Sequence, residues 1–177
     1  NLYEFLGWSY LKGFICNLTI NQGHLKRDYD LLKEAIQANF IKGLGISYRS
    51  ELKWLIPKEL LEYEHTVFHC IIGIDTFNDV LQLRDKGVNK ILLLGEKSFG
   101  FHEGKVNTFS HNHNQWKWWI HKLFHIFEVV SFDNLAIEQL KLERFFTKNN
   151  FNTFYQGEYS FYIDAVHKVF KPSSRDF

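Results

Sequence analysis

The sequence is poor in the residues that mark several classes of protein. Among its 177 residues it has no methionine, two prolines and two cysteines. So few prolines, and no low-complexity tract, argue against intrinsic disorder. Two cysteines cannot build a disulfide framework, and both Cys16 and Cys70 lie in segments that we predict to be buried strands. The absence of any methionine, even an initiator, is compatible with a fragment of a longer protein.

The chain also lacks an excess of charge and any long hydrophobic run. It carries 21 basic and 20 acidic residues, a formal net charge of +1. That balance gives no electrostatic argument for a nucleic-acid or membrane partner. No apolar run approaches the roughly 18 residues that span a bilayer, and the first residues do not resemble a signal peptide. We therefore expect a soluble, cytoplasmic protein.

What the sequence does contain is a regular alternation of strand and helix patterns. Aromatic residues make up 18% of the chain, enough for a sizeable core. Short β-branched runs at 13–20, 43–48, 66–74, 88–96 and 127–132 predict strands, and helical spacing predicts helices at 28–40, 51–64, 76–87, 114–127 and 135–146. This order is typical of an α/β fold of parallel βαβ units. Near-continuous apolar strands further predict a sheet covered on both faces.

Two arrangements of these units fit the pattern, an open doubly wound sheet and a segment of a barrel. Five repeats are too few for a complete eightfold barrel. We expect one domain over residues 1–177, with βα repeats over 13–146 and a C-terminal tail, 147–177, that contains an edge strand near 159–166.

Polar residues and glycines follow each predicted strand, at the end where parallel sheets bind their ligands. They are Asn21, Gln22, Ser47, Arg49, Gly73, Asp75, Gly95, Lys97, Asp133 and Asn134. Such a ring suits a hydroxyl-rich or carboxylate-bearing ligand. Asp75 and Asp133 could equally cap the helices that follow them, whereas Asn21 and Gln22 are harder to explain as caps because the predicted helix begins several residues later.

Histidines are the other conspicuous group, with nine in the chain. His121 and His125 have the i,i+4 spacing of metal ligands, but no third ligand stands at a fixed spacing, so we expect no metal site. A metal-dependent hydrolase that uses His111 and His113 remains a weaker alternative. His69, within a strand, is expected to be a hydrogen-bonded inner residue that could touch substrate. We predict that Trp116, Trp118 and Trp119 form the core and rim of their helix, without a role in base stacking.

Several segments, in this order, resemble radical SAM-like proteins of phages and mobile elements. They are NLTINQGHL, GLGISYRS, VFHCIIGI, KILLLGEKSFG, VVSFDNLAIEQL and, near the end, FYQGEYSFYIDAVHKVFKPSSRD. SFDNLAIEQL is the most specific of them. The resemblance covers residues 13–175 and implies a partial (β/α) barrel of parallel strands with helices on the outside.

The resemblance also implies cofactors, S-adenosylmethionine and a 4Fe–4S cluster, and positions for them. By position, the cofactor-binding residues would be Ser47, Arg49, Ile72, Gly73, Leu94 and Gly95. The substrate side would comprise Asn21, Gln22, His69, Lys97, Asp133, Asn134 and Gln139. The substrate itself, a small molecule or a peptide, is not indicated.

The sequence departs from this family at the cluster. The CxxxCxxC motif is absent, as are the first strands of the barrel, so Cys16 and Cys70 cannot supply three cluster ligands. The leading hypothesis is a radical SAM-like chain without its N-terminal strands and cluster; the alternative is a non-catalytic binding or assembly module on a degraded barrel. The strand that begins at Gly13 would then be an apolar edge, covered by upstream residues, by residues 1–10 or by a second copy in a homo-oligomer.

Overall fold

The computed structural model describes residues 1–52, 56–97, 109–145, 162–164 and 169–171. Its contacts divide the chain into two compact units, Asn1–Leu140 and Lys141–Phe177. The second unit contains a 3-10 helix, η3 (Leu142–Phe145), and two antiparallel strands, β6 (Tyr162–Asp164) and β7 (Val169–Lys171). The tail strand predicted near 159–166 therefore exists at 162–164.

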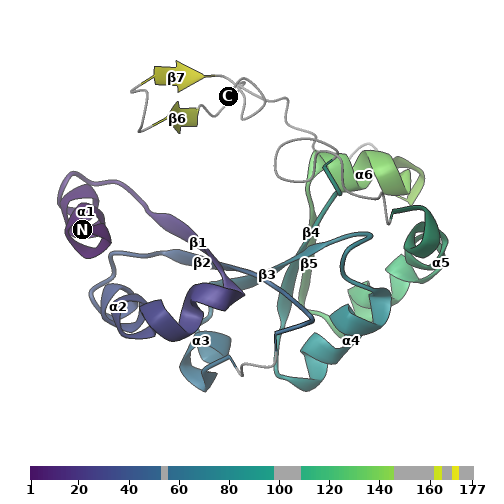
Figure 1. Ribbon diagram of the computed structural model, residues 1–177, viewed down its shortest axis with the longest axis horizontal. Helices are drawn as coiled ribbons and strands as arrows, with labels where there is room; N and C mark the ends of the chain where they lie inside the picture. The colour runs from purple at the N-terminus through teal and green to yellow at the C-terminus, as the bar shows by residue number, and fades with distance from the viewer. Residues whose placement is uncertain (53–55, 98–108, 146–161, 165–168, 172–177) are drawn as a thin grey trace. The chain divides into compact units, whose positions relative to one another are not determined.

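The first unit is built on a five-stranded parallel sheet (Figure 1). Its strands are β1 (Asn17–Asn21), β2 (Gly43–Ser47), β3 (Thr66–Ile71), β4 (Lys90–Leu94) and β5 (Val129–Phe132). The helices between them are α2 (Leu25–Gln37), α3 (Lys58–Glu62), α4 (Phe77–Asp85) and α5 (Phe109–Ile126), and α6 (Asn134–Leu140) follows β5. The predicted parallel α/β alternation is confirmed.

The strands stand side by side in chain order, β1 to β5. Because each crossover between neighbouring parallel strands is right-handed, all the connecting helices pack on the same face of the sheet; Figure 1 shows α2 to α5 on that side. The side chains that point toward the helices are buried, among them Leu44, Ile46, Phe68, Ile91 and Leu93. Trp116 of α5 is also fully buried and meets the ring of Phe77 edge-on, at 5.4 Å between centroids.

The other side of the sheet, which we call the open face, is less covered. Its residues alternate with the buried ones along each strand, and they are exposed at Asn17 and Thr19 and half-buried at Ser47, His69 and Leu92. Among the described residues of the first unit, the second covering layer that we expected is not present on this face. The sequence of these strands looks continuously apolar because apolar residues also occur on the open face among its polar residues. They are the half-buried Val67, Ile71, Leu92 and Leu94.

The N-terminal residues form a helix, α1 (Leu2–Leu11), that the sequence patterns did not predict. It begins at a capping box between Asn1 and Glu4 and packs against the end of α2, where the Phe40 ring contacts Tyr3 and Tyr10. Phe14 and Ile15, between α1 and β1, remain exposed. β1 is an edge strand of the described sheet, with alternating character, so the edge is less apolar than expected.

One cysteine differs from expectation, whereas the tryptophans take the expected core and rim positions of their helix. Cys70 is fully buried within β3, as predicted, but Cys16 precedes β1 and is only half-buried. Of the tryptophans, Trp118 and Trp119 are exposed on α5, whereas Trp116 is in the core. Among the described residues, no helix combines the length and apolar character needed to cross a membrane.

Gly95, directly after β4, allows the sheet and α6 to approach closely. A Cβ at this position would lie 2.5 Å from Leu135 Cγ and 2.7 Å from the Leu135 carbonyl carbon. Since real Cβ atoms do not come this close to backbone, the first turn of α6 packs against the strand end only if residue 95 has no side chain.

We predict that Gly95→Ala lowers the free energy of unfolding by about 1–3 kcal/mol, because α6 must move to admit the methyl group. Chemical denaturation measures the change. Ser131→Ala, at an exposed position of the neighbouring β5, is the control and should change stability by less than about 0.5 kcal/mol. A Gly95→Ala chain as stable as the control would contradict the packing described here.

Candidate functional site

The carboxyl ends of the five strands bring together most of the residues predicted to form a site. At the ends of β1 and β2, Gln22 is buried, and its Oε1 accepts a hydrogen bond from the backbone N–H of Arg49 at 2.9 Å. Asn21 Oδ1 accepts from the N–H of Gly23 at 2.9 Å. Asn21 therefore caps a short 3-10 helix, η1 (Gln22–His24), that runs directly into α2. The expectation that these two residues were not caps is wrong for Asn21.

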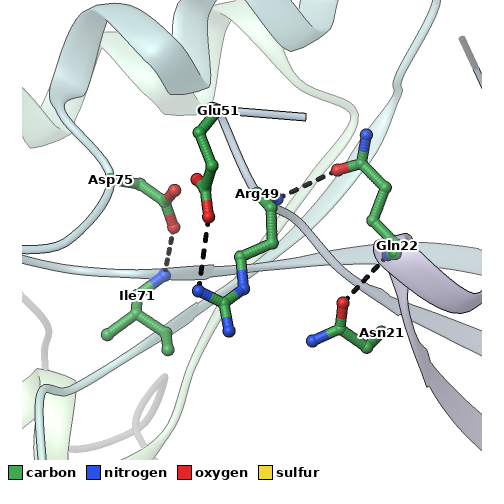
Figure 2. Close-up of polar contacts among 7 residues, drawn as sticks. Asn21, Gln22, Arg49, Glu51, Ile71 and Asp75 are labelled. Atoms are coloured by element: carbon green, nitrogen blue, oxygen red, sulfur yellow. Dashed lines mark hydrogen bonds and ion pairs between the residues drawn. The ribbon is translucent and has the colours of Figure 1, made fainter. Parts of the chain in front are cut away.

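Arg49 and Glu51 form a charged pair beside these residues. The Arg49 Nη1 lies 3.4 Å from Glu51 Oε1, and both side chains are solvent-accessible. Figure 2 shows these two side chains with Asn21, Gln22 and Asp75 at the ends of β1 to β3. An exposed ion pair of this kind contributes little to stability, so the guanidinium can exchange Glu51 for an anionic ligand at little cost.

Asp75 is almost fully buried, at 2% exposure, after the turn that ends β3. Its Oδ2 accepts from the backbone N–H of Ile71 at 2.7 Å. Burial, more than the nearby carboxylates of Asp79 and Glu51, raises the pKa of Asp75 to about 6. Asp75 does not cap α4; Thr76 does, in a capping box with Asp79.

Asp133 and Gln139 tie the end of β4 to α6. Asp133 Oδ1 accepts from the N–H of Ala136 at 2.7 Å, which caps α6, and from the N–H of Gly95 at 3.0 Å. The Gln139 amide bonds to both backbone groups of Glu96, at 3.0 Å and 2.8 Å. Of the two aspartates for which capping was an open alternative, Asp133 is therefore a cap and Asp75 is not.

A cavity of about 170 Å³ lies at the ends of β3, β4 and β5. It is lined by Ile71, Ile74, Leu94, Gly95, Glu96, Lys97 and Asp133. Its walls are mainly apolar, but Glu96 Oε2 is a buried oxygen that accepts no hydrogen bond from the described residues. A buried carboxylate oxygen without a donor is costly, since burial strips the charge of water. A ligand that carries an N–H or ammonium group would remove this cost.

Other predicted site residues lie apart from this cavity. Ile72 is fully buried and its N–H donates to Leu94 O at 2.9 Å, so only its neighbours Ile71 and Ile74 line the cavity. Gly73 forms the turn after β3 with a positive φ of 96°, and Asn134 is exposed at the start of α6. Ser47 and His69 lie on the open face.

The histidine pair on α5 does not form a metal site in the part of the chain that the structure describes. His121 and His125 are both exposed, and no three metal-ligating side chains come together among the described residues. The backbone of His111 and His113 belongs to α5, but their side chains are outside the part that the structure describes.

Three residues were not among the site residues that the resemblance implies. Asp75 was weighed as a ligand-facing residue or as a cap, Glu96 was considered only as part of a strand end, and Thr19, on the open face, not at all. The run LLLGEK carries a signal for Glu96, because an acidic residue this close to a buried strand is seldom buried without a partner or a ligand. Thr19 gives no such signal, since its neighbours depend on strand register.

Comparisons with known proteins add no family to this geometry. No family model matches the chain, and neither a curated protein nor a solved structure matches it. The function must therefore be argued from the strand ends and the open face.

The raised pKa of Asp75 predicts a pH-dependent stability. The folded state holds this proton more tightly than the unfolded chain does, so the free energy of unfolding should fall as the pH rises from about 4 to 7. Asp75→Asn keeps an acceptor for the Ile71 N–H and removes the charge. We expect the free energy of unfolding of the variant to exceed that of the wild type by up to about 3 kcal/mol at pH 7. We also expect the decrease of this free energy between about pH 4 and 7 to lose the part that Asp75 causes.

Urea denaturation at several pH values measures this difference. Asp30→Asn, at an exposed position of α2, makes the same chemical change on the surface and should leave the slope as in the wild type. An Asp75→Asn slope equal to that of the wild type would show that Asp75 is not the responsible group.

Proposed function

We propose that this chain is the later part of a radical SAM-type partial barrel, and that its strand ends bind S-adenosylmethionine. In this proposal the missing first strands would stand beside β1, and the helices would form the outside of the barrel. The chain-order parallel sheet and its single helix-covered face support the proposal, because a barrel segment requires both. The choice of S-adenosylmethionine as the ligand comes from the sequence segments that resemble radical SAM-like proteins.

The buried oxygen of Glu96, which has no partner among the described residues and lies beside the cavity, is the observation that carries the proposal. S-adenosylmethionine brings a flat adenine with an amino group, an ammonium and a carboxylate. The apolar walls formed by Ile71, Ile74 and Leu94 fit a flat ring, and the Glu96 carboxylate can accept from either nitrogen group. Arg49, across the strand ends, is a guanidinium suited to the carboxylate.

The described residues do not fit a 4Fe–4S cluster. Cys70 is fully buried toward the helices, and burial raises the pKa of its thiol well above the usual range, which opposes the thiolate that iron requires. Cys16 precedes β1, at the opposite end of the sheet from the cavity. We therefore derive no cleavage of S-adenosylmethionine by this chain and propose binding alone.

A non-catalytic binding or assembly module is the second candidate. One observation favours it: α1 and the residues after it expose a set of large apolar side chains, namely Leu2, Phe5, Trp8, Tyr10, Leu11, Phe14 and Ile15. Apolar exposure on this scale is typical of contact surfaces. A stable oligomer by light scattering, with no effect of S-adenosylmethionine, would favour this candidate over the first.

We predict that S-adenosylmethionine raises the melting temperature saturably, and that Glu96→Gln weakens its binding about tenfold or more. Loss of a charge-assisted hydrogen bond of about 1.5 kcal/mol or more gives this factor. The unliganded Glu96→Gln chain should be at least as stable as the wild type, because the variant no longer buries a charge. Opposite effects on folding and binding distinguish a ligand contact from a structural one.

Isothermal titration calorimetry measures the affinities. Glu138→Gln makes the same change on the exposed surface of α6 and should bind as the wild type does. If S-adenosylmethionine has no measurable affinity for the wild type, or if the two variants bind alike, the proposed site is refuted.

A further inference from the structure

The open face holds a polar pair that lies deeper in the sheet than the strand ends. Gly45, in the middle of β2, has no side chain, and two neighbours lie over it. A Cβ built at Gly45 would be 2.7 Å from His69 Nε2 and 2.8 Å from Thr19 Oγ1. The imidazole and the hydroxyl therefore both lie over Gly45, from the strands on either side.

Strand register explains the convergence. Thr19 is the direct partner of Gly45 across β1 and β2, so its hydroxyl stands beside the glycine. His69 pairs with Ser47, which is the next residue after Gly45 on this face of β2. The His69 ring leans back over Gly45. Any side chain at position 45 would displace both groups, because each would lie closer than 3.0 Å to the new Cβ.

Neither side chain of this pair has a hydrogen-bond partner among the described residues. Thr19 is exposed and His69 half-buried, so both are reachable from the open face. Burial lowers the pKa of His69, and the imidazole is therefore mainly neutral at pH 7. A neutral imidazole offers one donor and one acceptor, and the hydroxyl of threonine offers one donor and two acceptors.

We propose that Thr19 and His69 form a binding site for an uncharged hydroxyl group, such as that of a sugar or a cyclic polyol. The ligand O–H donates to a ring nitrogen of His69, and the same oxygen accepts from the Thr19 hydroxyl. Val67 and Leu92, half-buried on the same face, offer apolar contact to the carbon-bound hydrogens of a ring. The inference does not depend on the proposed cofactor, which would bind at the strand ends, and it names a different class of ligand.

An anion would be a poorer ligand for this pair. A carboxylate is bound most strongly by a charged imidazolium, and burial opposes the charged form of His69. Arg49, which suits an anion, follows β2 at the strand ends, whereas Thr19 and His69 flank Gly45 in the middle of that strand. The polar groups of this face therefore separate into a place for an anion and a place for hydroxyl groups.

The test uses myo-inositol as an uncharged polyol and acetate as a charged comparison, with two-dimensional ¹H–¹⁵N NMR on the full chain. Myo-inositol is expected to cause saturable shifts in the amide signals of Thr19, Gly45 and His69, and acetate to leave them unchanged. Thr19→Val, which replaces the hydroxyl with a methyl group of similar shape, and His69→Phe should each weaken the interaction at least fivefold.

Ser131→Ala removes an exposed hydroxyl from β5 on the same face and should bind as the wild type does. The inference is overturned if the wild type shows no shifts with myo-inositol, if acetate causes them instead, or if Thr19→Val binds unchanged. Because Thr19 is exposed, Thr19→Val is expected to keep the fold, and it tests the hydroxyl site even if His69→Phe fails to fold.

Titration of the same samples with S-adenosylmethionine separates the two proposals. Binding of myo-inositol without any effect of S-adenosylmethionine would refute the proposed cofactor and leave the hydroxyl site in place. The reverse result would refute only the hydroxyl site.

Discussion

The structure depends on parallel pairing of the five strands in chain order. Since every crossover has the same hand, this order sends all connecting helices to one face, and in the described part of the first unit no helix layer covers the other face. It also brings the carboxyl ends of all five strands to one edge. The cavity brings together residues that are far apart in the sequence, such as Ile71, Gly95 and Asp133, for this reason, and Asp75 bonds to the backbone of Ile71 in its wall.

The strand ends are held in place by side chains that bond to backbone groups. Gln22 holds Arg49, Asp75 holds the end of β3, and Asp133 and Gln139 hold the segment after β4. These four residues explain why polar side chains follow apolar strands even without a ligand. They also free the neighbouring residues, Arg49 and Glu96, for a ligand, because the backbone is already fixed.

The sequence predicted the strands and helices well where their patterns have a clear period, as in β2 and α4. It missed α1, because LYEFLGWSYL is apolar on all sides and has no helical period. It missed the role of Asn21 as a cap, because η1 carries no pattern of its own. It could not pair Thr19 with His69, since they are 50 positions apart and meet only through the register of β1, β2 and β3.

The glycines of this sheet show how one residue type serves two purposes. Gly95 lets a helix approach, and its Cβ would meet backbone atoms that cannot move independently. Gly45 instead makes room for side-chain atoms, the ring of His69 and the hydroxyl of Thr19, which would lie less than 3.0 Å from a Cβ at this position. Both groups would have to turn away from a methyl group, and the stiff χ1 angle of threonine opposes this turn. Packing therefore favours glycine at both positions, and the proposed hydroxyl site uses the two polar groups that Gly45 admits.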